Sequence, residues 1–131
     1  MTEPDAASAP SQAIVLIAHG SRATAANEAH QAMAAELEGR LGVPVVAAFL
    51  ELAEPSIATG IATAVDTGAA TIHVLPYFLY PGRHMTRDIP EQVAEAASKH
   101  PDATIEVLEA FGADPAVVGL LAAQATRSVA H

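Results

Sequence analysis

Short apolar runs, each followed by a longer segment with the residue pattern of a helix, recur four times along this chain of 131 residues. Strands of a parallel sheet are apolar because helices cover both faces, and consecutive strands are joined by a crossover helix. The alternation therefore predicts an α/β fold: one domain with a mostly parallel four-stranded sheet and helices on both faces. The expected strands are 13–18, 44–52, 70–79 and 103–111, and the expected helices are 24–41, 54–68, 88–100 and 114–130.

The chain has the length of one ordinary domain, and no apolar run reaches the roughly 18 residues that span a bilayer. The segment before the first apolar run carries acids and no basic residue, which is not the pattern of a secretory signal. We therefore expect a flexible tail over residues 1–12, a single domain over residues 13–131, no membrane association and a cytoplasmic location.

The composition excludes several kinds of ligand. A net charge of −9 disfavours nucleic acid, whose phosphates need a basic face, but favours a divalent cation. The chain has no cysteine, so disulfides, thiolate metal sites and iron–sulfur clusters are excluded. The glycine-rich phosphate-binding patterns are absent, and we expect no organic cofactor.

Polar residues follow three of the predicted strands. His19 comes after the first strand, Glu51 ends the second, and the segment 79–88 follows the third. Because the carboxyl ends of parallel strands meet at one edge of a sheet, these residues are predicted to share a site. Imidazole and carboxylate suit first-row divalent metals, although a histidine in such a turn can equally have a structural role.

The rare positive charges gather near two histidines. Arg22, Arg83 and Arg87 each lie within three residues of His19 or His84, and they make up half of the six basic residues. On an acidic protein this clustering suggests a local anionic ligand.

Other residues have structural interpretations. His73 lies inside a predicted strand, where packing or local hydrogen bonding is expected. Asp88 and Glu91 have the spacing of a helix capping box. Within 24–41, apolar residues recur with helical spacing at Met33, Leu37 and Leu41. The remaining histidines are expected to be solvated: His30, His100 and His131.

Three stretches, IVLIAHGSR, FLELAEPSI and PYFLYPGRHMTRDIP, resemble in order and spacing the short sirohydrochlorin chelatases, a family of cobaltochelatases and siroheme ferrochelatases. The resemblance implies that His19 and His84 bind the metal, with Glu51 assisting. It also places Glu54 at the substrate side, and it implies a homodimer. The residues it implies along the tetrapyrrole are Leu79, Tyr80, Pro81, Gly82, Arg83 and His84.

Inserting a divalent metal into sirohydrochlorin displaces two pyrrole protons. In this interpretation His19 serves as ligand and general base, with Glu51 as its catalytic partner. Arg22, Arg83 and Arg87 would hold substrate carboxylates. We predict a sirohydrochlorin cobaltochelatase with Co²⁺ as co-substrate, and ferrochelatase or nickel chelatase activity as alternatives.

Two other classes of protein are alternatives to this prediction. A non-catalytic metal or tetrapyrrole carrier on the same fold would keep His19 and His84 but show no turnover. A phosphatase-like histidine site is disfavoured, because such sites need an arginine directly before the histidine and Ala18 stands there.

Overall fold

The structure is a computed structural model that describes residues 10–80 and 82–129. Within them, four parallel strands form one sheet in the order β3-β2-β4-β5. The strands are β2 (Gln12–Ala18), β3 (Val45–Phe49), β4 (Thr71–Pro76) and β5 (Thr104–Val107). The predicted α/β fold is confirmed, although the last three strands are shorter than expected.

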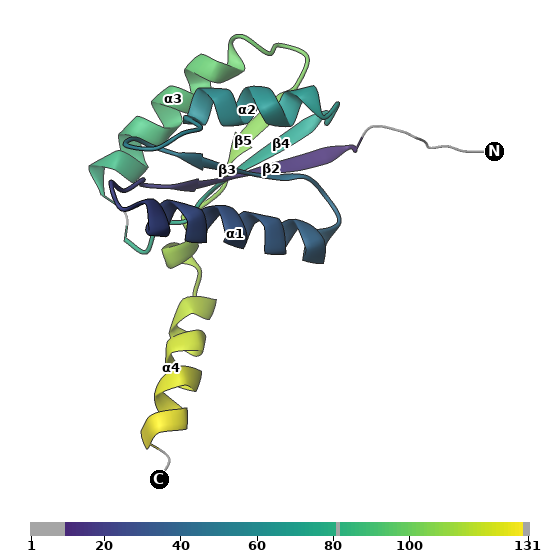
Figure 1. The fold of residues 1–131 in the computed structure, drawn as a ribbon. Helices are drawn as coiled ribbons and strands as arrows, with labels where there is room; N and C mark the ends of the chain where they lie inside the picture. The colour runs from purple at the N-terminus through teal and green to yellow at the C-terminus, as the bar shows by residue number, and fades with distance from the viewer. Residues whose placement is uncertain (1–9, 81, 130–131) are drawn as a thin grey trace, which may run out of the picture.

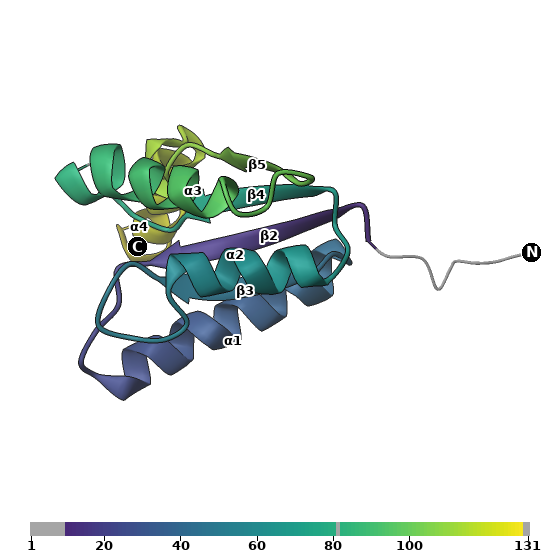
Figure 2. The same ribbon diagram turned by 90° about the horizontal axis from the view of Figure 1, so that it is seen from above.

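Helices lie on both faces of the sheet, as predicted. Figure 1 shows α2 and α3 on one face and α1 on the other, and Figure 2 shows α2 and α3 side by side along their face. The helices are α1 (Thr24–Leu41), α2 (Ile57–Asp66), α3 (Ile89–Ala97) and α4 (Ala116–Val129). The predicted fourth helix is present, but α4 extends away from the sheet instead of covering it. None of the described helices is both long and apolar enough to cross a membrane.

Alternate residues of the central strand supply two separate cores. Val15 and Ile17 of β2 are fully buried in the larger core beneath α2 and α3. Leu16 points to the opposite face, where it forms a smaller cluster with Ala34 of α1 and Val45 of β3. A strand turns successive side chains to opposite faces, so a continuous apolar run is needed where helices cover both.

His30 of α1 is buried, with only 6% of its surface exposed, so the expectation that it is solvated is wrong. Its Nε2–H donates to the carbonyl of Leu16 at 2.9 Å. Its ring contacts Phe49 edge-on, at 5.2 Å between centroids, and stacks on Tyr77 at 6.3 Å. His30 lies one helical turn before Ala34, which is also buried, and this row of α1 therefore faces the sheet.

Asp88 does not cap α3, contrary to the prediction. A π-helical turn, η1 (His84–Asp88), runs directly into α3, so Asp88 already has helical dihedral angles and makes no capping hydrogen bond. Its Oδ1 accepts a hydrogen bond from Arg87 Nε at 3.3 Å. π-Helical turns are frequent at functional sites.

His73 bonds locally, as predicted. Its Nδ1 lies 2.6 Å from Oε1 of Glu106 on β5, and its Nε2 lies 2.6 Å from Oε1 of Gln12 on β2. His100 is half-buried, and His131 lies outside the described residues.

Candidate functional site

The carboxyl ends of β2, β3 and β4 are aligned by their register. Ala18 pairs with Phe49, and Ile17 pairs with Pro76. Hydrogen bonding between the strands continues past their ends, because the amide of Glu51 donates to the carbonyl of His19 at 3.0 Å. The loops after the three strands therefore begin side by side, as predicted.

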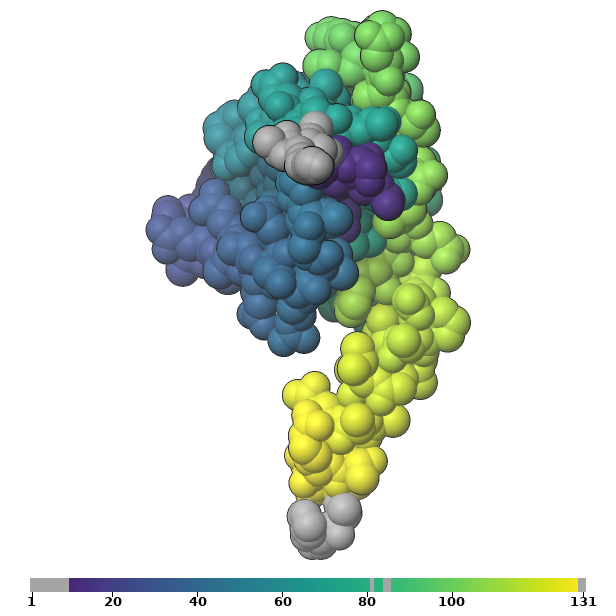
Figure 3. All heavy atoms as spheres, turned by 90° about the vertical axis from the view of Figure 1, so that its right-hand side faces the viewer, coloured from purple at the N-terminus to yellow at the C-terminus, as the bar shows by residue number. Residues whose placement is uncertain are grey.

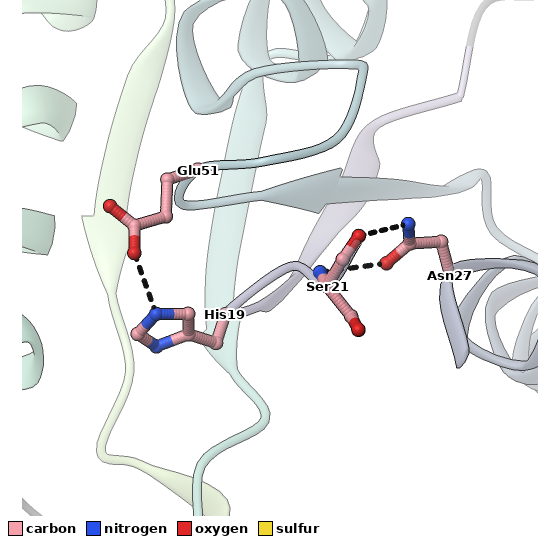
Figure 4. A network of polar contacts seen from close by, with 4 residues as sticks. All are labelled: His19, Ser21, Asn27 and Glu51. Atoms are coloured by element: carbon pink, nitrogen blue, oxygen red, sulfur yellow. Dashed lines mark hydrogen bonds and ion pairs between the residues drawn. The ribbon is translucent and has the colours of Figure 1, made fainter. Parts of the chain in front are cut away.

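His19 and Glu51 form a direct pair at this edge. His19 Nε2 lies 2.8 Å from Glu51 Oε2, and Figure 4 shows the two side chains turned toward each other. The side chains are 45% and 50% exposed, so water and ligands reach both groups. An exposed pair of this kind adds little stability. An imidazole beside a carboxylate can instead bind a cation or accept a proton, with the carboxylate fixing the ring and its tautomer.

The turn after His19 is held by Asn27 in the first turns of α1. Asn27 Oδ1 accepts the amide hydrogen of Ser21 at 3.0 Å, and Asn27 Nδ2 donates to the Ser21 carbonyl at 2.7 Å, as Figure 4 shows. The Ser21 hydroxyl in turn accepts the amide hydrogen of Ala23 at 3.0 Å. Between His19 and this clamp, Gly20 adopts a φ of 100°, which favours glycine.

Asn27 was not identified from the sequence as a residue of the site. An Asn at a helix start also fits ordinary capping, and only the fold shows that both polar atoms of its amide bind Ser21. The sequence indicates this role only weakly: Asn27 lies six residues after Ser21 of the HGS stretch, near the start of the predicted helix.

The segment after β4 brings apolar side chains to the same edge. The ring of Phe78 packs partly against the larger core and lies 6.2 Å from the ring of His19. The next two residues turn outward, so that Leu79 is 57% and Tyr80 is 82% exposed. Exposed apolar side chains beside a polar pair suit a flat, partly apolar ligand.

The remaining predicted site residues are on exposed loops or helix turns. Glu54 is exposed in the connection that also carries Glu51, and Gly82 is exposed after β4. The three arginines are exposed as well, with Arg22 between β2 and α1 and the others next to or within η1: Arg22, Arg83 and Arg87.

Two predicted residues fall outside this description. Pro81 lies outside the described residues, and so does the side chain of His84, whose backbone begins η1. The predicted pairing of His84 with His19 stays a prediction. Among the side chains that the structure does describe, no group of three His, Asp or Glu could hold a metal ion. A metal bound by His19 and Glu51 would therefore take its further ligands from elsewhere.

Comparison with known proteins places the chain in a family. The CbiX family matches residues 13–128. The sirohydrochlorin ferrochelatase of Bacillus subtilis is 41% identical over 82% of this chain and 41% of its own length. The sirohydrochlorin cobaltochelatase of Sulfolobus acidocaldarius is 33% identical over 88% of this chain and 91% of its own length. The chain thus spans less than half of the Bacillus relative but most of the Sulfolobus one.

A solved structure agrees with the fold. The crystal structure of the sirohydrochlorin chelatase SirB from Bacillus subtilis subspecies spizizenii in complex with cobalt superposes with a TM-score of 0.79. The two sequences are 34% identical, and the match covers 88% of this chain and 50% of SirB.

Proposed function

Because the chain belongs to the CbiX family, we propose that it is a sirohydrochlorin chelatase, an enzyme that inserts a divalent metal into this tetrapyrrole. The observation that carries the proposal is the His19–Glu51 pair, half-exposed at the edge where the loops after β2, β3 and β4 meet. The names of the relatives support sirohydrochlorin as the substrate.

Insertion exchanges two protons for one metal ion. The two pyrrole N–H bonds break, four nitrogens bind M²⁺, and two protons leave the macrocycle. His19 donates its Nε2–H to Glu51, so its other ring nitrogen, Nδ1, is the one proposed to bind the incoming ion or to accept one of these protons. Glu51 orients the imidazole from 2.8 Å and stabilises its positive charge after proton transfer. His84, on η1, is proposed as the second histidine ligand of the ion.

The macrocycle would lie over the segment after β4. Leu79 and Tyr80 offer exposed apolar surface beside Phe78, which neighbours His19. Sirohydrochlorin carries eight carboxylates on its rim, and exposed guanidinium groups can pair with them. The residues proposed for this role are Arg22, Arg83 and Arg87, with Pro81, Gly82 and Glu54 also lining the substrate.

Cobalt is proposed as the preferred metal, with iron as the main alternative and nickel as a further one. The relative that this chain matches over nearly its whole length is named a cobaltochelatase, which supports cobalt. The ferrochelatase of Bacillus subtilis is more similar in sequence but more than twice as long. Imidazole and carboxylate ligands alone do not select among these ions, because they bind all of them in the general divalent series.

The test is an anaerobic absorbance time course of sirohydrochlorin with the purified chain and, separately, Co²⁺, Fe²⁺ and Ni²⁺. Protein-free mixtures give the spontaneous rate. We expect wild-type protein to accelerate the shift of the Soret and visible bands, most strongly with Co²⁺, and His19→Ala to remove the acceleration. His73→Ala is the matched control, because His73 also pairs with a glutamate but lies within β4, away from the edge.

The other outcomes are equally informative. A spectrum that shows binding but no accelerated insertion with any of the three ions would identify a carrier and remove the catalytic roles of His19 and Glu51. If Fe²⁺ or Ni²⁺ were inserted faster than Co²⁺, the protein would still be a chelatase, but cobalt would not be its preferred metal.

A further inference from the structure

The buried side chain of His30 touches all three segments that carry the site. Its Nε2–H donates to the carbonyl of Leu16 on β2 at 2.9 Å. Its ring meets Phe49, the last residue of β3, edge-on with the centroids 5.2 Å apart. The same ring stacks against Tyr77, directly after β4, at 6.3 Å. A single residue of α1 thus connects the carboxyl ends of three strands from below.

These contacts lie immediately upstream of the site. Each contacted residue precedes a site residue by one to three positions: Leu16 before His19, Phe49 before Glu51, and Tyr77 before Phe78. A shift of any strand end would therefore be passed on to the side chain that follows it. Misplacement of reacting groups by about 1 Å can cost a factor of about 100 in rate. The packing around His30 is thus close enough to the site to affect its geometry.

Packing on this face of the sheet depends on α1. Among the described helices α1 alone lies along it, because α4, yellow in Figure 3, projects away from the body of the domain. The buried residues of α1 are His30 and Ala34. Ala34 packs in the cluster that includes Val45, the first residue of β3, whereas His30 contacts Phe49 at the other end of that strand. Of these two buried residues, His30 is therefore the one that supports the carboxyl ends.

His30 does not fill its position in the most stabilising way. Its Nδ1 is buried and has no hydrogen-bond partner within the described part of the chain. Because Nε2 carries the proton that Leu16 accepts, Nδ1 of the neutral ring is a bare acceptor. An unpaired buried polar atom costs stability, and an apolar side chain of similar size would avoid that cost. This unpaired nitrogen points to a role for His30 beyond filling space.

We propose that His30 is a positioning residue for metal insertion. By holding the ends of β2 and β3 and the segment after β4 against α1, it keeps His19 within 2.8 Å of Glu51 and keeps Phe78 beside the pair. The inference rests on the proposed function, since it concerns the same pair. His30 is 6% exposed, so it acts through the residues that it aligns and not on the substrate.

The first test is His30→Leu, assayed with the metal ion that the wild type inserts fastest. We expect kcat to fall by about 10-fold, while the KM for sirohydrochlorin and the urea midpoint of unfolding stay close to the wild-type values. Ala34→Gly is the control, because it weakens the same helix and face away from the strand ends. It should lower the urea midpoint but keep kcat. If His30→Leu keeps wild-type kcat, or if Ala34→Gly loses as much, the proposal is overturned.

The second test asks whether His30 acts through the His19–Glu51 pair. His30→Leu is combined with Glu51→Gln, and kcat is compared with that of each single variant. If His30 serves to place this pair, its replacement should matter little once the pair is disrupted, so the double variant should have about the kcat of Glu51→Gln. Losses in kcat that multiply would show that the two residues act independently, which contradicts the proposal.

The third test does not depend on turnover. Donation of Nε2–H to Glu51 favours one tautomer of His19, which keeps the ¹⁵N signals of its two ring nitrogens far apart. In an NMR spectrum of the histidine side chains, with His19→Ala as the assignment control, we expect His30→Leu to move these two signals toward each other. Ala34→Gly should leave them in place.

The two proposals fail in different ways. A wild-type protein without turnover would refute the proposed function, and the role of His30 in insertion with it. If the wild type inserts metal but the His19 signals are unchanged in His30→Leu, the chelatase remains and only the positioning role of His30 is refuted.

Discussion

Gly20 and Glu51 approach so closely that a Cβ on residue 20 would lie 1.7 Å from the Glu51 carbonyl oxygen. The two loops that carry His19 and Glu51 are therefore packed backbone to backbone at the edge of the sheet. This contact brings the imidazole and the carboxylate within 2.8 Å of each other. The glycine of the HGS sequence is thus required for the geometry of the pair.

Gly20→Ala is expected to lower the free energy of unfolding by about 1–3 kcal/mol, because it combines a φ of 100° with a clash against backbone. Gly39→Ala is the control, since Gly39 is helical, has open space around its Cβ position, and should gain up to about 1 kcal/mol. Urea denaturation of both variants measures the difference. If the Gly20→Ala and Gly39→Ala variants were equally stable, the two loops could move apart at little cost in free energy.

Glu51→Gln is expected to lower kcat for metal insertion by about 10-fold to 100-fold, the usual effect of removing a carboxylate that supports a histidine ligand. The amide keeps the size of the side chain but not its charge. Glu106→Gln is the matched control, because Glu106 on the edge strand β5 pairs with His73 of β4 at 2.6 Å, away from the loops that carry His19 and Glu51. If both variants keep wild-type kcat, the charge of Glu51 has no part in the reaction.

Asn27→Ala removes two hydrogen bonds to Ser21 and is expected to cost about 1–3 kcal/mol of stability. As a positioning residue, Asn27 should also affect kcat, because the loop that carries His19 loses its attachment to α1. Gln31→Ala, on the exposed side of the same helix, should change neither quantity. A loss of stability with unchanged kcat, measured well below the unfolding temperature, would show that Asn27 is only structural.

Arg22→Ala and Arg83→Ala are each expected to raise the KM for sirohydrochlorin by up to about fivefold, since exposed ion pairs contribute up to about 1 kcal/mol. The KM for the metal should stay constant. Lys99→Ala removes the same charge beyond the far end of α3 and serves as the control. The difference in KM for sirohydrochlorin between the arginine variants and the wild type should become smaller at high salt, which screens exposed charges. An equal rise in KM for all three variants would point to net charge rather than contact.

The part of the site that lies on strand ends could be predicted from the sequence. The apolar run ending at His19 and the run ending near Glu51 identify parallel strands, and parallel strands place their carboxyl ends at one edge. The register of β2 with β3 then brings the two residues together. That His19 and Glu51 are directly paired did not follow from the sequence, because the loops extend beyond the strands and their backbone contact depends on Gly20.

His30 shows why burial on α1 was mispredicted. The helix is rich in alanine, so its apolar pattern is weak, and the prediction depended on its few large apolar side chains. Met33 and Leu41 are 46% and 51% exposed, whereas His30 and Ala34 face the sheet. A histidine can occupy such a position because Nε2–H donates to Leu16 and the ring packs against aromatic side chains. These partners come from β2, β3 and the segment after β4, which no local pattern identifies.

By itself, the sequence determined the alternation of strands and helices, the parallel sheet and the edge that holds the site, because these depend on short-range apolar patterns and on general rules of chain connection. The tertiary structure alone decided the contact between the loops at Gly20 and Glu51, the burial of His30 and the outward course of α4. Each of these depends on how segments far apart in the chain pack together. For α4 the helical pattern is clear in the sequence, but its course away from the sheet follows a turn in which the amide of Gly112 donates to the distant carbonyl of Phe78 at 2.8 Å.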